Sequence, residues 1–264
     1  MPEPEAPMIA TLSPDLISRL IPFSIASSPS AMGTRLPRFS AVIISAPLLH
    51  ALRVGLLLGL ALLLTGQLAR AESTAGERPR ILVVGDSISA AYGMSLEQGW
   101  AALLERRLQT RWPGAQVINA SISGDTSAGG ARRLPKLLAE HSPDLVVIEL
   151  GGNDGLRGYP TSKLEANLSF MAEAASTAGA EVLILPMEIP PNYGPRYTRS
   201  FRESFERAAT DTGATLGPFL LDGIATEEQL MQQDGIHPTV EAQPMITDIV
   251  QPVIEALLAL REAS

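Results

Sequence analysis

A short aliphatic run that stops abruptly at small polar residues is the feature that most constrains this chain. Ile81–Val84 is continuously apolar and is followed directly by Gly85, Asp86 and Ser87. An apolar run without alternation is typical of a parallel strand that is buried on both faces. Gly85 permits a tight turn, so we expect a helix to begin at Ser87, whose backbone N–H would have no partner inside that helix. The pattern predicts a small nucleophile at the edge of a sheet.

The same pattern recurs along the chain, where apolar strands alternate with amphipathic helices. Further strands are expected over 117–118, 145–150, 182–185 and 215–216, and helices around 96–108, 134–138, 164–175, 201–208 and 246–258. The second of these helices is expected to hold Pro135 in its first turn, where proline is best tolerated. Such alternation predicts an α/β domain with a parallel sheet covered by helices on both faces. Ligands of such sheets bind beyond the carboxyl ends of the strands.

The residues before position 72 are expected to be a leader rather than part of the domain. Val54–Leu64 is an uncharged apolar stretch, and Ala69-Arg70-Ala71 fits the small-x-small pattern of a secretory cleavage site. We therefore expect a leader over 1–71, with Met32 as an alternative start, cleavage after Ala71, and a periplasmic or secreted protein. A retained membrane anchor is the alternative, although the apolar stretch is shorter than the ~20 residues that a span needs.

The remaining segment, 72–264, is expected to form a single domain. Its 25 acidic and 15 basic residues give a net charge of −10, which argues against nucleic acid as a partner. The chain contains no cysteine, so disulfides, thiol nucleophiles and thiolate metal sites are excluded. No repeat or coiled-coil pattern is present, and a monomer is expected.

A serine, an acid and a histidine together form a candidate triad for acyl transfer. His237 is the base that the sequence favours, because His50 lies in the leader and His141 lies where a helix is expected to end. Asp234, three residues before His237, can accept from Nδ1–H and leave Nε2 facing Ser87. Each residue also has an ordinary structural interpretation, such as a helix cap for Ser87. Their joint occurrence near predicted strand ends favours catalysis.

Four segments resemble the sequence blocks of the SGNH (GDSL) hydrolase family. They are Gly85-Asp86-Ser87, Gly124, Gly151-Gly152-Asn153-Asp154 and Asp234-Gly235-Ile236-His237. The resemblance extends over nearly all of 80–258. It implies a flavodoxin-like, three-layer α/β/α sandwich around a five-stranded parallel sheet, with no metal or organic cofactor. It also implies hydrolysis of acyl esters and thioesters through an acyl-enzyme, with aryl esters, lysophospholipids and acyl thioesters as substrates and transient contact with membrane lipid.

The resemblance also assigns roles to individual residues. It implies a triad of Ser87, Asp234 and His237, and an oxyanion hole formed by the N–H groups of Ser87 and Gly124 and the side-chain amide of Asn153. A loop over 155–161, flanked by 190–194, would shape the acyl groove. The candidate substrate-binding residues are Asp86, Gly155, Leu156, Tyr159, Pro160, Pro191 and Tyr193.

We expect three acidic residues near these segments to have structural roles. Asp86 and Asp154 are expected to fix loops through hydrogen bonds to backbone N–H groups. Glu149, inside a predicted buried strand, must be paired or neutral.

Two other functions remain to be weighed against the hydrolase. Phosphoryl transfer with Asp86 as nucleophile would require a second acid close by and a lysine at a later strand end, and the chain has only Lys136 and Lys163. A lipid or acyl-chain binding protein of the same fold, weak in catalysis, would lack a triad or oxyanion residue, and none is missing. The hydrolase remains the leading hypothesis.

Overall fold

The computed structural model describes residues 78–263. The expected leader over 1–71, the alternative start at Met32 and the cleavage site after Ala71 lie outside the described residues, so the predictions for them stay predictions. Within 78–263, no helix is both long enough and apolar enough to cross a bilayer.

Five parallel strands form one sheet, as expected. They are β1 (Arg80–Gly85), β2 (Gln116–Asn119), β3 (Leu145–Glu149), β4 (Glu181–Ile184) and β5 (Thr215–Leu216). Their order is β2-β1-β3-β4-β5, and all neighbouring pairs are parallel. This is the flavodoxin-like order, in which ligands bind beyond the carboxyl ends at the switch point between β1 and β3.

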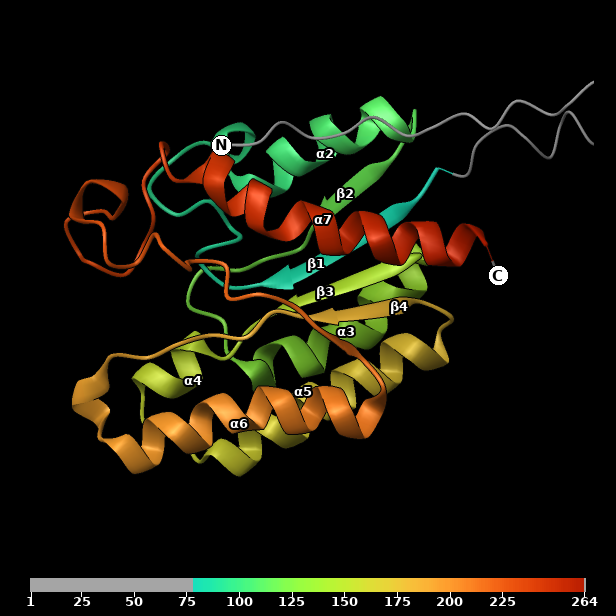
Figure 1. The fold of residues 1–264 in the computed structure, drawn as a ribbon. Coiled ribbons are helices and arrows are strands. Elements are labelled where there is room, and N and C mark those ends of the chain that lie inside the picture. Colours follow the sequence, from blue (N-terminus) through green and yellow to red (C-terminus); the bar gives the residue numbers. More distant parts are fainter. Residues whose placement is uncertain (1–77, 264) are drawn as a thin grey trace, which may run out of the picture. The chain divides into compact units, whose positions relative to one another are not determined.

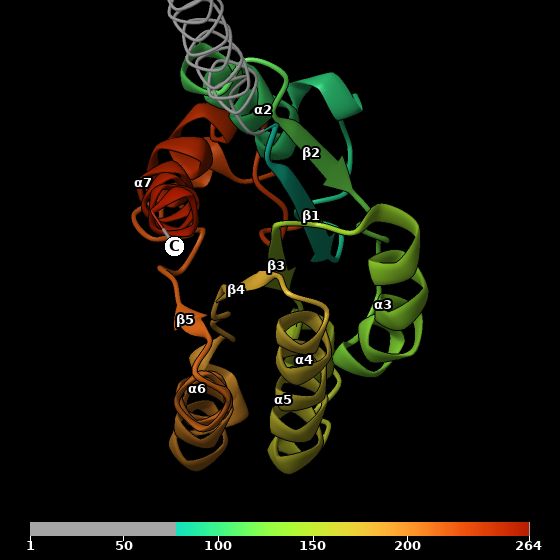
Figure 2. The same ribbon diagram turned by 90° about the vertical axis from the view of Figure 1, so that its right-hand side faces the viewer.

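Helices cover both faces of this sheet and make the three expected layers (Figures 1 and 2). On one face lie α2 (Trp100–Arg111) and α7 (Gln243–Glu262), and on the other lie α3 (Ser127–His141), α5 (Thr161–Thr177) and α6 (Pro195–Thr212). The shorter helical segments are α4 (Gly152–Leu156), η2 (Leu96–Gln98), η3 (Pro191–Tyr193) and η4 (Glu228–Leu230).

Burial explains why the strand sequences are apolar without alternation. All five residues of β3 are buried, as are all residues of β1 after Arg80, because helices pack on both faces of the sheet. The largest fully buried side chains include Trp100 from one helical layer and Phe201 and Phe205 from the other. Each fully buried aliphatic or aromatic side chain contributes about 1.5–3 kcal/mol. The sheet is therefore a firm support for the loops at its carboxyl edge.

The structure corrects the expectation that a helix begins at Ser87. Residues 87–93 instead form successive turns, closed by hydrogen bonds from Ala90 N–H to Asp86 O (2.9 Å) and from Tyr92 N–H to Ser87 O (3.1 Å). Ala91 and Gly93 have φ of +56° and +78°, and this left-handed backbone prevents a regular helix. Ser87 thus lies in a compact loop after β1.

A second correction concerns the start of α3. This helix begins at Ser127 rather than near Pro135, and the Thr126 side chain caps it by accepting from Gly129 N–H at 3.3 Å. Pro135 therefore lies in the helix interior, where its missing N–H removes one helical hydrogen bond. Because α3 starts early, its first turn reaches the loop that contains Gly124.

Candidate active site

Ser87 and His237, which are 150 residues apart in the sequence, lie side by side at the carboxyl edge of the sheet. The hydroxyl oxygen of Ser87 lies 2.8 Å from Nε2 of His237, and Nδ1 of the same ring lies 2.6 Å from Oδ2 of Asp234. The serine comes from the loop after β1, and the other two residues come from the loop before α7. The three side chains form a continuous hydrogen-bonded chain in which Nε2 of His237 can take the proton of the serine hydroxyl.

Local geometry fixes the charge of Asp234 and the tautomer of His237. Oδ1 of Asp234 accepts from the backbone N–H groups of Ile236 (2.9 Å) and His237 (3.1 Å), so the carboxylate closes its own turn. Burial opposes ionisation, but these bonds and the bond from the His237 ring outweigh it and lower the pKa of Asp234 to about 2. A carboxylate at this position requires a proton on Nδ1, which leaves Nε2 free to accept from Ser87.

A clamp that the sequence did not reveal joins the serine loop to the histidine loop. The side-chain amide of Gln232 donates to the carbonyl oxygens of Tyr92 (2.8 Å) and Pro238 (3.0 Å). The Tyr92 ring lies against the His237 ring, with centroids 4.3 Å apart. Gln232 and Tyr92 are 140 residues apart, so no local pattern could have paired them.

The residues of the three expected oxyanion donors, Ser87, Gly124 and Asn153, line one cavity. Gly124 has φ of +78°, a left-handed backbone that strongly favours glycine. Asn153 lies on α4, directly after β3, and its Nδ2 donates to Oδ2 of Asp86 at 3.1 Å. A side-chain amide carries two N–H bonds, so one remains for a substrate oxygen.

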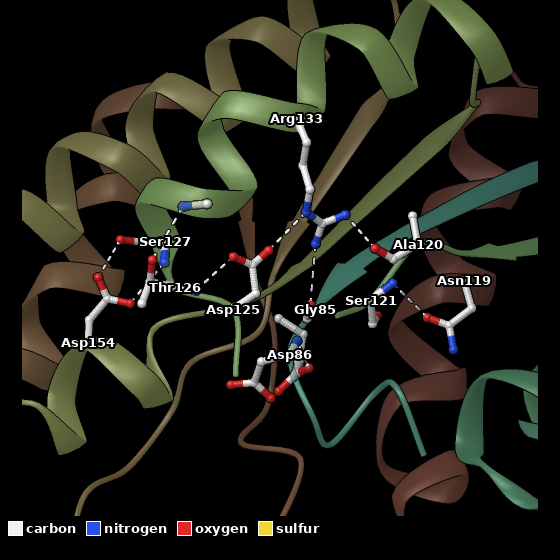
Figure 3. A network of polar contacts seen from close by, with 12 residues as sticks. Gly85, Asp86, Asn119, Ala120, Ser121, Asp125, Thr126, Ser127, Arg133 and Asp154 are labelled. Carbon is white, nitrogen blue, oxygen red and sulfur yellow. Dashed lines mark hydrogen bonds and ion pairs between the residues drawn. The ribbon is translucent and has the colours of Figure 1, made fainter. Parts of the chain in front are cut away.

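Asp86 anchors the serine loop from within the protein, as expected. Its side chain is buried, and Oδ1 accepts from the backbone N–H of Ile88 at 3.1 Å. Burial raises the pKa of Asp86 to about 6, although hydrogen bonds from Ile88 and Asn153 act in the opposite direction. Asp154 acts similarly on the next loop, because its carboxylate accepts from the N–H (2.8 Å) and the hydroxyl (2.7 Å) of Ser127 (Figure 3).

Glu149 lies fully buried beneath Asp86, and its partners are now visible. Its Oε2 accepts from the Ser89 hydroxyl (2.6 Å) and from the Asp86 N–H (3.2 Å), and its Oε1 has no partner. Burial, followed by the nearby charge of Asp86, raises the pKa of Glu149 well above its usual value of 4.5. The expectation of a paired or neutral glutamate is confirmed.

Replacing Glu149 with glutamine is expected to flatten the dependence of stability on pH. A group with a raised pKa in the folded state stabilises the fold fully below its unfolded pKa, and this contribution is lost as pH rises through the folded value. For Glu149 the loss starts near pH 4.5. Glutamine can still accept from Ser89 and cannot lose a proton. Chemical denaturation between about pH 4.5 and pH 8 should therefore show a smaller fall in unfolding free energy for Glu149→Gln than for wild type.

Glu173→Gln provides the matched control, because Glu173 is exposed on α5. Its pH profile should follow that of wild type. Equal slopes for wild type and Glu149→Gln would contradict the prediction. The slope that remains in Glu149→Gln would belong largely to Asp86, whose contribution is lost between pH 3.8 and about 6.

The cavity beside Ser87 is large and mostly apolar. Its volume is about 660 Å³, within the range of sites for small molecules. Its apolar wall residues include Ile88, Met187, Ile189, Phe219, Leu221, Ala225, Met231 and Ile236. Most of these come from irregular segments after β4 and β5, which periodicity does not detect. The cavity has room for an apolar chain beside the Ser87 hydroxyl.

Of the seven expected substrate-binding residues, Asp86, Leu156 and Pro191 line this cavity. The other four, Gly155, Tyr159, Pro160 and Tyr193, are not among the residues that line it, and their contact with a substrate stays a prediction. Gly155 is buried under Ile189.

Hydrogen bonds from two tyrosine hydroxyls, those of Tyr193 and Tyr197, hold the segment around 156–159. The Tyr193 hydroxyl donates to Leu156 O at 2.7 Å, and the Tyr159 carbonyl accepts from the Tyr197 hydroxyl at 2.7 Å. The expected loop over 155–161 is also shorter than predicted, because α4 extends to Leu156 and α5 begins at Thr161. In the described part of the chain, no three His, Asp or Glu side chains gather where they could hold a metal ion.

A hydrogen-bonded Ser-His-Asp chain at the carboxyl edge of such a sheet, beside an apolar cavity, defines the class of serine hydrolases. The chain belongs to the GDSL-like lipase/acylhydrolase family, whose model matches residues 83–243. This confirms the resemblance inferred from the four sequence blocks.

Named relatives agree with this assignment. The chain is 51% identical over 199 residues to esterase TesA from Pseudomonas aeruginosa, covering 75% of this chain and 96% of that protein. It is 42% identical over 178 residues to thioesterase 1/protease 1/lysophospholipase L1 from Escherichia coli strain K12, covering 67% and 84%. The crystal structure of esterase EstA from Pseudoalteromonas sp., inhibited by monoethylphosphonate, matches with a TM-score of 0.66 at 44% identity, covering 68% of this chain and 98% of that one.

Proposed function

We propose that this protein hydrolyses acyl esters and thioesters through an acyl-enzyme on Ser87. The observation that supports this most directly is the hydrogen-bonded chain from Ser87 through His237 to Asp234. Nε2 of His237 takes the hydroxyl proton while the serine oxygen bonds to the acyl carbon, and the carbonyl oxygen becomes an oxyanion. The Ser87 and Gly124 N–H groups and the Asn153 amide stabilise that charge.

The rest of the cycle uses the same groups. The tetrahedral intermediate collapses, the carbon–oxygen or carbon–sulfur bond to the leaving group breaks, and the alcohol or thiol takes the proton from His237. Water then attacks the acyl carbon while His237 takes its proton; the bond to the Ser87 oxygen breaks, that oxygen takes the proton back from His237, and the carboxylic acid leaves. Asp234 keeps its charge throughout and stabilises the protonated ring.

The apolar cavity suits the acyl portion of the substrate. Its mostly apolar wall gives a polar chain few hydrogen-bond partners. Burial of an acyl chain there would stabilise binding by about 0.8 kcal/mol per methylene group. We assign aryl esters, lysophospholipids and acyl thioesters as substrates, classes that agree with relatives named arylesterase and thioesterase 1/protease 1/lysophospholipase L1. Tyr92 and Ile236, both exposed and both lining the cavity, would make the transient contact with membrane lipid. We further propose that the protein is exported to the periplasm or the medium, that 72–264 forms a single domain, and that this domain is a monomer.

A panel of p-nitrophenyl esters of increasing acyl length, with an acyl thioester beside it, tests this function on the full chain. We expect turnover of both classes, with kcat/KM rising with acyl length until the cavity is filled. A p-nitrophenyl alkylphosphonate should stop the activity: the Ser87 oxygen bonds to phosphorus, p-nitrophenolate leaves, and the peptide that contains Ser87 gains the mass of the alkylphosphonyl group. An acyl ligand that binds without turnover, together with an unlabelled Ser87, would support the acyl-chain binding protein instead.

A further inference from the structure

The guanidinium of Arg133 lies beneath the loop that carries Gly124, outside the cavity. Arg133 projects from α3 toward the carboxyl ends of β1 and β2 (Figure 3). Its side chain is 20% exposed and that of its partner Asp125 is 13% exposed. This ion pair is therefore shielded from solvent, unlike most surface pairs.

Arg133 binds three separate segments at once. Its Nε donates to Oδ2 of Asp125 at 2.9 Å, one Nη donates to Ala120 O, and the other donates to Gly85 O at 3.4 Å (Figure 3). Ala120 follows β2 directly and Gly85 ends β1. Asp125 follows Gly124, and Gly85 precedes Ser87 by two positions. One planar fork thus ties the segment with the nucleophile to the segment with the expected oxyanion donor.

The backbone around Asp125 holds its carboxylate in one position. Oδ1 accepts from Thr126 N–H at 2.9 Å, and the Asp125 N–H donates to Ile122 O at 3.0 Å. A Cβ at Gly129 would lie only 1.7 Å from Oδ1, so the first turn of α3 leaves room for this carboxylate only because residue 129 is glycine. The position of Asp125 is therefore fixed on two sides, by Arg133 and by the start of α3.

Gly124 needs such support from its neighbours. It lies at an exposed part of the loop, has no side chain, and adopts a left-handed backbone. Its carbonyl oxygen is held by the exposed Arg157, whose Nη2 donates at 3.1 Å. An oxyanion donor acts fully only when it is held in place before the reaction begins.

We propose that Arg133, acting through Asp125, is a positioning residue that holds the Gly124 N–H in place relative to Ser87 for oxyanion stabilisation. This inference rests on the proposed function and adds a residue that does not touch the substrate. Lysine is a poor substitute, because a single ammonium cannot reproduce the planar fork that reaches Asp125, Ala120 and Gly85 together.

Comparison of Arg133→Met and Arg133→Lys with Arg132→Met tests the proposal. Arg132 is the next residue on α3 and is exposed, so it is a matched control. We expect kcat on a p-nitrophenyl ester to fall about 10- to 100-fold in Arg133→Met and somewhat less in Arg133→Lys, with KM within about threefold of wild type. Arg132→Met should keep kcat within about twofold.

A transition-state analogue separates positioning from a loss of folded protein. An alkylboronic acid forms a tetrahedral adduct on the serine and uses the oxyanion hole, so its Ki should rise by the same factor as kcat falls. Partial unfolding would lower kcat per mole of protein without changing this Ki. An unchanged kcat, or a lowered kcat with an unchanged boronate Ki, would overturn the proposal.

The Asp125→Asn variant and the activity of wild type provide two further tests. If Arg133→Met does not fold, Asp125→Asn removes the ion pair with little change of shape and should give the same rise in boronate Ki. A normal Ki in a folded Asp125→Asn would count against the proposal. An inactive wild type would contradict the proposed function itself, a result distinct from any difference between active wild type and the Arg133 variants.

Discussion

Replacing Ser87 with alanine is expected to lower kcat/KM for p-nitrophenyl esters by about 10⁵-fold or more. The hydroxyl oxygen lies 2.8 Å from Nε2 of His237, and its removal leaves no atom to form the acyl-enzyme. The fold should be retained, because alanine differs from serine only by this oxygen. Initial rates, with far-UV circular dichroism and thermal unfolding as checks of folding, provide the measurement.

The triad also predicts how the variants combine. Because serine and histidine act as one unit, Ser87→Ala, His237→Ala and the double variant should lose similar amounts of activity rather than multiply their effects. His141→Ala and Ser162→Ala are the matched controls: His141 ends α3, and Ser162 is exposed on α5. Multiplicative losses in the double variant, or a Ser87→Ala protein that keeps a tenth of wild-type activity, would contradict the mechanism.

The sheet could be predicted from sequence because its strands are short, apolar and separated by helices. The runs at 81–84 and 145–150 place β1 and β3 nearly residue by residue. The prediction failed where backbone conformation overrides local pattern. At Ala91 the left-handed φ prevents the expected helix, and turns form instead. Pro135 lies inside α3 because the helix begins more than two turns earlier, at the cap residue Thr126. Proline is tolerated there at a cost in hydrogen bonding that tertiary packing offsets.

The polar centre of the candidate site was readable because its residues lie in short motifs, one directly after β1 and one in the loop before α7. Ser87, Asp234 and His237 were singled out from such motifs, and the structure brings them within hydrogen-bond distance. The supporting contacts were not readable. Gln232 and Arg133 act through side-chain bonds to distant backbone carbonyls, which leave no periodic or local signature. The cavity walls come from irregular segments for the same reason.

Replacing Asn153 with alanine is expected to lower kcat about 10²- to 10³-fold while KM changes little. The Asn153 amide lines the cavity with Ser87, and Asp86 accepts one of its hydrogens at 3.1 Å. The Asp86 carboxylate therefore turns the nitrogen of the amide, rather than its oxygen, toward the serine side. The negative charge is absent from the bound substrate and develops on the way to the tetrahedral intermediate, so the loss of this donor should appear in kcat.

Asn192→Ala is the control, because Asn192 is exposed on η3 and does not line the cavity. Asn153→Asp adds a second test, since a carboxylate in place of the amide cannot donate and would lie beside the Asp86 carboxyl. It should be at least as slow as Asn153→Ala, because a carboxylate next to the developing oxyanion repels its negative charge. If Asn153→Ala instead raises KM and leaves kcat unchanged, the amide binds the ground state, and the oxyanion hole consists of backbone N–H groups alone.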